Sequence, residues 1–291
     1  MLSVIIPAYD EAESIADTVQ RVRKTMDSSE MEYEIIVVDD GSSDDTAERA
    51  AIEGVTLIRH PVNAGYGRAL KTGIQHARYE WCAILDADGS YPIERLTDLL
   101  EYVPHFDMVV GARSGKQYWG SFGKRIARLA LLAVVRFIVG VRVPDVNSGF
   151  RIFRKDLMLA HSQRISSGFS FTTTLTLAMI LDERFVHYVP IDYHPRVGVS
   201  KVRMRRDSLR MLQVLVQAVL YYNPLKIFLA VCLGCVAVGI VGGLLIGLAN
   251  ALAGVFFLGV AASLAILVGV LGLLTESIRL RSLVGRYRPD T

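Results

Sequence analysis

The stretch AILDADGSYP, Ala83 to Pro92, places two carboxylates directly after an apolar run. Asp86 and Asp88 are separated by a single alanine and are followed by residues typical of a turn. Two like charges this close raise each other's pKa unless a positive charge lies between them. Aspartate oxygens bind Mg²⁺ and Mn²⁺ and leave other coordination positions to a diphosphate and water, so the stretch predicts a metal site at the end of a strand.

The residues around this stretch indicate an α/β fold. The predicted strands are LSVIIP, YEIIVVDD, VTLIRH, WCAILDAD and DMVVGAR, and the predicted helices between them are EAESIADTVQRVRKTM, SDDTAERAAIEG and GYGRALKTGIQHA. Continuous apolar strands separated by helices predict a mostly parallel, Rossmann-like sheet covered on both faces. Ligands bind at the carboxyl ends of such strands, where Asp39 and Asp40 close the second predicted strand.

The C-terminal part of the chain is apolar enough to cross a membrane twice. Residues 227–249 and 251–274 carry no charge, and the first run alone spans roughly 34 Å as a helix, against about 30 Å of hydrocarbon. Only Asn250 separates the runs, which predicts a transmembrane helical hairpin. Lys226 precedes it and arginines follow it, which places both ends in the cytoplasm; these arginines are Arg279, Arg281, Arg286 and Arg288. Met1 leads directly into LSVIIP, an apolar run that is too short for the hydrophobic region of a signal peptide, so we expect no signal peptide.

Two basic, apolar stretches precede the hairpin. The predicted helix at about 123–142 carries Arg125, Arg128 and Arg136 on one stripe, which favours either the membrane surface or packing against a neighbouring helix or subunit. The second stretch, KVRMRRDSLRMLQVLVQAVLYY (201–222), leads into the hairpin and predicts a juxtamembrane helix beside anionic lipid, assigned to 211–224. The expected layout is a cytoplasmic domain over 1–210, this helix, two spans within 225–277, and a cytoplasmic basic tail over 278–291.

Five motifs in their order and spacing resemble glycosyltransferase family 2, and within it the polyprenyl-phosphate hexose synthases of the dolichol-phosphate mannose or glucose synthase type. They are VIIPAYDEAESI (4–15), VVDDGSSDDT (37–46), NAGYGRALKTGI (63–74), LDADGSYP (85–92) and VVGAR (109–113). The resemblance covers residues 1 to about 210. It implies a GT-A fold, a nucleotide-sugar donor, Mg²⁺ or Mn²⁺ as cofactor, and inversion at the anomeric carbon.

The resemblance also implies roles for single residues at the donor site. Pro7, Tyr9 and Glu11 would line the nucleotide, Asp39 would contact the base or ribose, with Asp40 beside it, and Asp86 and Asp88 would bind the metal and diphosphate. Two positions depart from the family pattern: Asp10 replaces an asparagine, and Ser90 stands where many relatives carry a glutamine that helps to hold the metal. We expect Ser90 to reach the metal directly or through a water.

The acceptor side predicts a phosphate acceptor. Family members that act on a sugar hydroxyl usually offer an acidic residue in the region SGFSFTTTLTLAMI (167–180), but here no carboxylate occurs before Asp182. A phosphate is already ionised at neutral pH and needs no base. Cationic side chains would bind it and the diphosphate. By the resemblance these are Arg113, Arg151, Arg196 and Lys201, and Arg125 and Ser200 are further candidates at the acceptor phosphate and its loop.

The sequence therefore predicts a membrane-anchored, inverting hexosyltransferase that moves a sugar from UDP-glucose or GDP-mannose to a polyprenyl phosphate. Two alternatives stay open: a family 2 transferase with another lipid or glycan acceptor, and a catalytically silent scaffold that binds a nucleotide or lipid. No nucleic acid is expected as a partner. Hairpins of this kind often pack with copies of themselves, so a homo-oligomer is a further expectation.

Overall fold

The computed structural model describes residues 1–196 and 204–284. The chain divides into two compact units, Met1–Val214 and Leu215–Thr291, which are described separately. Helix α9 (Met204–Tyr222) contains both the unit boundary and the boundary that the sequence suggested at residue 210.

The first unit is built on a seven-stranded sheet with the order β3-β2-β1-β4-β6-β5-β7. The strands are β1 (Leu2–Ala8), β2 (Tyr33–Asp39), β3 (Val55–Arg59), β4 (Trp81–Ile84), β5 (Met108–Ser114), β6 (Arg151–Arg154) and β7 (Val186–Asp192). All pairs are parallel except those of β6, which runs antiparallel to both β4 and β5. The predicted α/β class and mostly parallel sheet are confirmed, and the five strands expected before residue 114 all form.

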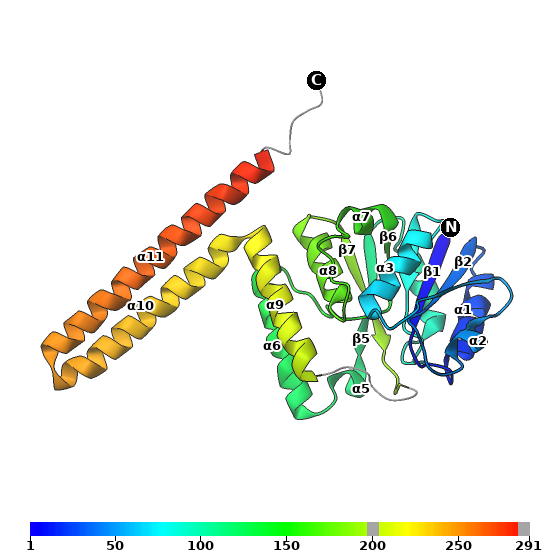
Figure 1. Ribbon diagram of the computed structural model, residues 1–291, viewed down its shortest axis with the longest axis horizontal. Helices are drawn as coiled ribbons and strands as arrows, with labels where there is room; N and C mark the ends of the chain where they lie inside the picture. The colour runs from blue at the N-terminus through cyan, green and yellow to red at the C-terminus, as the bar shows by residue number, and fades with distance from the viewer. Residues whose placement is uncertain (197–203, 285–291) are drawn as a thin grey trace, which may run out of the picture. The chain divides into compact units, whose positions relative to one another are not determined.

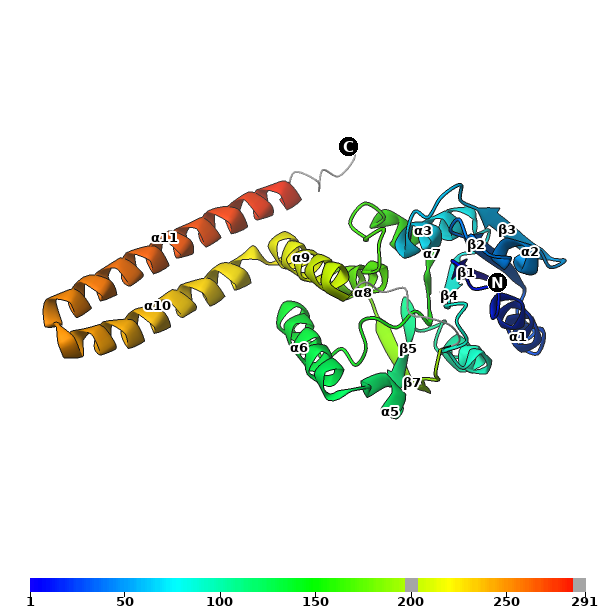
Figure 2. The same cartoon turned by 60° about the horizontal axis from the view of Figure 1, so that its bottom comes forward.

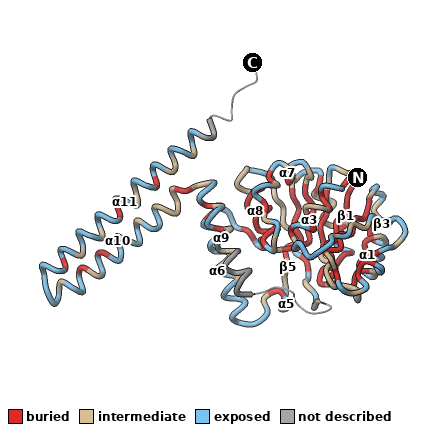
Figure 3. Tube along the Cα trace, in the orientation of Figure 1, coloured by how far each residue is buried: buried red, intermediate tan, exposed pale blue. Residues whose placement is uncertain are grey.

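Helices cover both faces of this sheet (Figure 1). They are α1 (Ile15–Asp27), α2 (Thr46–Ala50), α3 (Tyr66–His76), η1 (Ile93–Arg95), α4 (Leu96–Leu100), α5 (Gly115–Trp119), α6 (Phe122–Val139), α7 (Lys155–Ala160) and α8 (Phe171–Leu181). Side chains alternate between the faces of a strand, so β1 sends Val4 and Ile6 into the core that contains α1, and Ile5 into the core that contains α3 and α8. The strands β1, β2, β4, β5 and β6 are accordingly buried along most of their length, whereas β3 and β7, at the two edges of the sheet, are less buried (Figure 3).

Burial on both faces leaves the strand ends as the places where polar side chains can act. β1, β2 and β4 are parallel neighbours, so their carboxyl ends lie at one edge of the sheet. Asp39 is the last residue of β2 and Asp40 follows it, and Asp86 and Asp88 lie two and four residues after the end of β4. Helix α6 covers the expected stretch at about 123–142 and ends at Gly140, whose φ of 77° is the left-handed conformation that commonly terminates a helix.

The second unit contains α10 (Pro224–Ala249) and α11 (Ala251–Val284), which lie side by side (Figure 2). Asn223 caps α10 by accepting a hydrogen bond from the Lys226 N–H. Both helices are long and apolar enough to cross a membrane. In the most apolar 18 residues of each helix, only 11% and 17% are buried. Glycines bring the helices together: a Cβ on Gly254 would come 2.7 Å from the Gly247 Cα.

Candidate functional site

A cleft of about 1060 Å³ opens at the carboxyl ends of the central strands. It is lined by eight of the residues that the sequence suggested: Pro7, Tyr9, Glu11, Asp40, Asp86, Asp88, Arg113 and Arg196. Asp39, Ser90, Arg125 and Arg151 are not among its lining residues. Ser200 and Lys201 lie outside the described residues.

The two aspartates after β4 lie close together in this cleft. Burial, and secondly the charge of Asp88, raise the pKa of Asp86 to about 6. The Tyr66 hydroxyl donates to Asp86 Oδ1 at 2.8 Å, and Arg196 Nη2 lies 2.7 Å from Asp88 Oδ2. Two carboxylates this close, at the end of a strand and in a cleft, suit a divalent cation.

Such a cation would need ligands from outside the protein. Among the residues that the structure describes, no three His, Cys, Asp or Glu side chains converge into a metal site. Two carboxylates therefore fit a cation whose remaining ligands come from a diphosphate and water, which is how Mg²⁺ is commonly held at phosphate-transfer sites.

Ser90 acts on Asp88 and does not line the cleft. Its side chain is fully buried, and both its hydroxyl and its backbone N–H donate to Asp88 Oδ1, the latter at 3.0 Å. The serine therefore orients one of the two aspartates, and contact of Ser90 with the metal stays a prediction.

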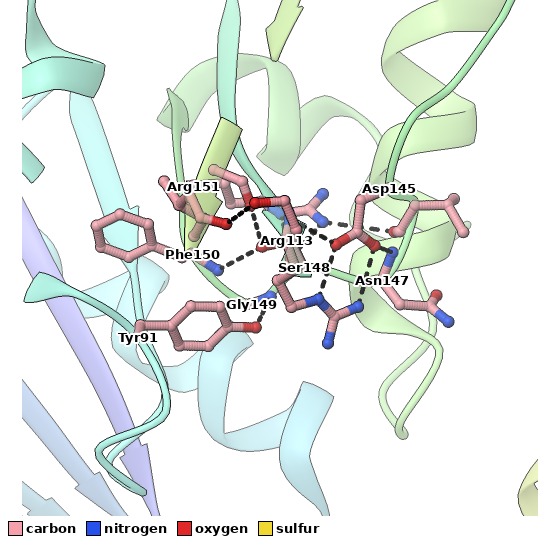
Figure 4. Close-up of polar contacts among 12 residues, drawn as sticks. Tyr91, Arg113, Asp145, Asn147, Ser148, Gly149, Phe150 and Arg151 are labelled. Atoms are coloured by element: carbon pink, nitrogen blue, oxygen red, sulfur yellow. Dashed lines mark hydrogen bonds and ion pairs between the residues drawn. The ribbon is translucent and has the colours of Figure 1, made fainter. Parts of the chain in front are cut away.

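A turn between α6 and β6 forms one wall of the cleft and is fixed by hydrogen bonds on both sides (Figure 4). Arg113 donates to both carboxylate oxygens of Asp145, at 2.7 and 3.0 Å. The Gly149 N–H donates to the Tyr91 hydroxyl at 2.7 Å, and a Cβ at Gly149 would come 2.7 Å from Asp86 Oδ2. Glycine at this position thus allows the backbone to approach the Asp86 carboxylate.

Arg151 belongs to the support of this turn and does not reach the cleft. Its side chain is fully buried, and burial lowers the pKa of its guanidinium. It donates to Ser148 O at 2.9 Å, to Thr172 O at 3.1 Å and to Thr176 Oγ1 at 2.9 Å. The structure gives Arg151 a positioning role where the sequence suggested contact with a phosphate.

Arg128 lines the cleft, although the sequence analysis selected Arg125. Arg128 lies over the Tyr118 ring at 4.3 Å, and its buried Nη1 atom has no hydrogen-bond partner among the residues that the structure describes. Burial and the charge of Arg113 lower the pKa of Arg128. Arg125 is exposed and lies over the Trp119 ring at 5.7 Å. The sequence places both arginines on the same basic stripe of the helix. Only the position of α6 in the structure shows which of them faces the cleft.

The two aspartates after β2 differ in their surroundings. Asp39 is fully buried, accepts from the Ser42 N–H at 3.0 Å and lies 3.1 Å from Arg59 Nε, away from the cleft lining. Asp40 lines the cleft and accepts from the backbone N–H groups of Ala64 and Gly65, at 3.0 and 2.7 Å. It therefore holds the backbone that precedes α3 at the edge of the cleft.

Comparison with known proteins identifies the family. Residues 3–161, more than half of the chain, match the family described as Glycosyl transferase family 2. The undecaprenyl-phosphate mannosyltransferase of Micrococcus luteus is 33% identical over 214 residues, which cover 68% of this chain and 86% of that protein. The low-salt glycan biosynthesis hexosyltransferase Agl6 of Haloferax volcanii is 30% identical over 215 residues, 72% of this chain and 51% of that protein. The chain thus spans about half the length of Agl6.

The fold is similar to that of glucosyl-3-phosphoglycerate synthase from Mycobacterium tuberculosis, solved with Mn²⁺, UDP-glucose and phosphoglyceric acid. The TM-score is 0.61 at 19% identity, over 75% of this chain and 79% of the other. The resemblance inferred from the motifs and the expected GT-A fold are confirmed by these comparisons.

Proposed function

Because the chain belongs to glycosyl transferase family 2, we propose that it transfers a hexose from a nucleoside diphosphate sugar to a polyprenyl phosphate. The observation that carries this proposal is the distribution of charge in the cleft. Paired aspartates lie after β4, and Arg128 lies on α6 with a terminal nitrogen that no described residue accepts from. The first arrangement suits a metal-bound diphosphate, and the second suits a separate phosphate.

On the donor side, Asp86 and Asp88 would hold Mg²⁺ or Mn²⁺, which when bound offsets negative charge on the departing nucleoside diphosphate. The related fold in glucosyl-3-phosphoglycerate synthase was solved with Mn²⁺ and UDP-glucose, which supports this cofactor and a nucleotide-sugar donor. Pro7, Tyr9 and Glu11 line the cleft beside the aspartates and would contact the nucleotide. UDP-glucose and GDP-mannose are the donors we propose to test.

On the acceptor side, Arg128 and Arg113 would bind the lipid phosphate. An ionised phosphate oxygen attacks the anomeric carbon while the bond to the diphosphate breaks on the opposite face, so the configuration inverts and no proton has to be removed. The carboxylates that line the described part of the cleft are Glu11, Asp40, Asp86 and Asp88. None of them lies in the region 167–180, where family members that act on a sugar hydroxyl usually offer an acidic residue. The absence of a base there favours a phosphate acceptor.

A lipid acceptor accounts for the apolar parts of the chain. We propose that α10 and α11 cross the membrane and that Lys226, Arg279 and Arg281 keep their ends, and the first unit, on the cytoplasmic side. Helix α6 exposes large apolar side chains beside basic ones, and we assign it to the membrane surface; the apolar residues are Phe122, Ile126, Leu129, Val134 and Phe137.

The experiment uses the full chain in nanodiscs with UDP-glucose or GDP-mannose, Mg²⁺ or Mn²⁺, and undecaprenyl phosphate. A lipid-linked sugar should form from the phosphate and not from undecaprenol or diacylglycerol, and a chelator should stop the reaction. Equal transfer to undecaprenol or diacylglycerol, or no transfer to any acceptor, would contradict the proposal.

A matched pair of variants tests the acceptor site. Arg128→Met should raise the KM for undecaprenyl phosphate by roughly 10-fold or more, since a charge-assisted hydrogen bond contributes about 1.5–3 kcal/mol. Arg125→Met, three residues away and exposed, should change this KM less. The reverse order would assign the acceptor phosphate to Arg125, as the sequence suggested.

A further inference from the structure

The threonine run of α8 sends each hydroxyl to a different part of the cleft wall. Thr173 Oγ1 donates to Asn147 Oδ1. Thr174 Oγ1 accepts from the Ser166 N–H at 3.0 Å and so holds a segment that also lines the cleft. Thr172 itself lines the cleft, and no described residue forms a hydrogen bond with its hydroxyl. The run therefore both builds the wall and leaves one hydroxyl available.

Asn147 is fixed with its amide group toward the cleft. Its backbone N–H donates to Asp145 Oδ1 at 3.0 Å, and Asp145 is held in turn by Arg113 (Figure 4). Because the Asn147 side-chain oxygen accepts from Thr173, its Nδ2 carries two N–H donors that no described residue uses. Asn147 lines the same cleft as Thr172.

These two polar groups lie close to the place where the donor diphosphate would bind. Asn147 is two residues before Gly149, whose backbone approaches the Asp86 carboxylate, and two residues span at most about 7 Å. One guanidinium, that of Arg151, donates to the backbone carbonyls of Ser148 and Thr172, so it links the residue after Asn147 to Thr172. A sugar attached to a diphosphate at Asp86 would therefore lie beside both groups.

We propose that the Asn147 amide and the Thr172 hydroxyl bind ring hydroxyls of the transferred hexose and determine which sugar is accepted. The proposal rests on the proposed function and deepens it by assigning the sugar-reading residues. Both groups are neutral, so they suit hydroxyl groups, whereas the cationic Arg128 suits the acceptor phosphate. A site built to bond a hydroxyl discriminates against an epimer, because the epimer leaves the buried polar groups unpaired.

The test compares each nucleotide sugar with its own nucleoside diphosphate. Thr172→Val removes the hydroxyl at nearly constant shape, Thr172→Ser keeps it, and Asn147→Ala removes the amide. The control is Thr56→Val, at an exposed position on β3. Affinities for UDP-glucose, UDP, GDP-mannose and GDP are measured calorimetrically with Mn²⁺, and kcat/KM is measured for UDP-glucose against its C4 epimer UDP-galactose.

Thr172→Val and Asn147→Ala should each weaken binding of the accepted nucleotide sugar by about 3- to 10-fold, the effect of one neutral hydrogen bond, and leave binding of the nucleoside diphosphate unchanged. Discrimination between the epimers should fall by a similar factor. Thr172→Ser, which keeps the hydroxyl, should weaken binding less than Thr172→Val, and Thr56→Val should behave like the unmodified protein. If both variants leave the ratio of sugar to diphosphate affinity and the epimer discrimination unchanged, the proposal is wrong. An increase only in the KM for undecaprenyl phosphate would likewise overturn it, by assigning the pair to the acceptor.

These measurements separate the inference from the proposed function. The ratio of nucleotide-sugar affinity to nucleoside-diphosphate affinity is measured without any acceptor. The ratio can therefore stay unchanged in the variants while lipid-linked sugar still forms, which contradicts only the inference. It can also change as expected in a protein that transfers sugar to a different acceptor, which contradicts only the proposed function. Unfolding midpoints of the variants confirm that each is folded. If Thr172→Val does not fold, Asn147→Ala decides the question alone.

Discussion

Replacing Arg151 with methionine should destabilise the first unit more than it affects the chemical step. The guanidinium is fully buried and lies outside the cleft lining. Methionine has similar length and no hydrogen-bond donor, so the substitution removes the contacts of Arg151 without opening a large cavity. Ser148 O then loses its donors, whereas Thr172 O keeps the bond from Thr176 Oγ1 at 2.9 Å.

The magnitude follows from the groups left unpaired. An unsatisfied buried acceptor costs about 1–3 kcal/mol, and the loss of the bonds at Thr172 O and Thr176 adds to this, while the removed cost of burying a charge offsets part of it. We expect the free energy of unfolding to fall by roughly 2–4 kcal/mol. For a unit of this size the midpoint of thermal unfolding shifts by about 2–4 °C per kcal/mol, so the decrease should be roughly 4–16 °C.

The assay combines thermal unfolding of the full chain in detergent with turnover measured well below the new midpoint. Arg151→Met should unfold earlier and retain turnover within about 10-fold at low temperature, because positioning contacts and not substrate contacts are lost. Arg151→Lys should be intermediate in stability, since an ammonium group cannot reach all of the same acceptors. An unchanged midpoint together with a turnover loss above about 100-fold would refute this reasoning and return Arg151 to the substrate.

Three further substitutions test other parts of the structure. Gly149→Ala should lower turnover by roughly 100-fold, measured at saturating substrate, because its Cβ would come 2.7 Å from Asp86 Oδ2 and displace that carboxylate. Ser90→Ala should weaken Mn²⁺ binding in the presence of UDP by about 10-fold, because the Asp88 carboxylate loses one of the two hydrogen bonds that Ser90 donates to it. An unchanged affinity for Mn²⁺ would contradict the orienting role of Ser90. Gly254→Leu should destabilise the hairpin by about 1–3 kcal/mol in detergent unfolding, whereas Gly259→Leu, which faces open space, should not.

The sequence was sufficient for the fold because its strands are long and apolar and its helices are clearly periodic. The strands β1, β2, β4 and β5 each contain a continuous run of buried residues, whereas β3, at the edge of the sheet, is only partly buried and was found by its short run rich in β-branched residues. β6 was not predicted, since its four residues, Arg151–Arg154, begin and end with arginine. Arg151 becomes compatible with a buried strand only because acceptors from α8 and the preceding turn surround it.

The same distinction explains which site residues could be found. Carboxylates directly after a strand, such as Asp86 and Asp88, are placed at the site by the chain itself, so sequence reasoning reaches them. Residues brought in by a different element are not placed in this way. Arg128 depends on the rotation of α6, and Asn147 on the turn that Asp145 fixes.

The threonine run shows why residue type alone is a poor guide to function at such a site. Thr172 to Thr174 lie in the region 167–180, which contains no carboxylate. From the sequence alone, that absence is compatible with a phosphate acceptor and with a catalytically silent scaffold. In the structure the hydroxyls of Thr173 and Thr174 each bond a residue of the cleft wall. The half-buried Asn147 amide and the Thr172 hydroxyl both line the cleft, where a ligand can use them. Neutral polar groups in the cleft that contains the paired aspartates are what a transferase that binds a sugar needs, so this arrangement favours an active transferase over a silent scaffold.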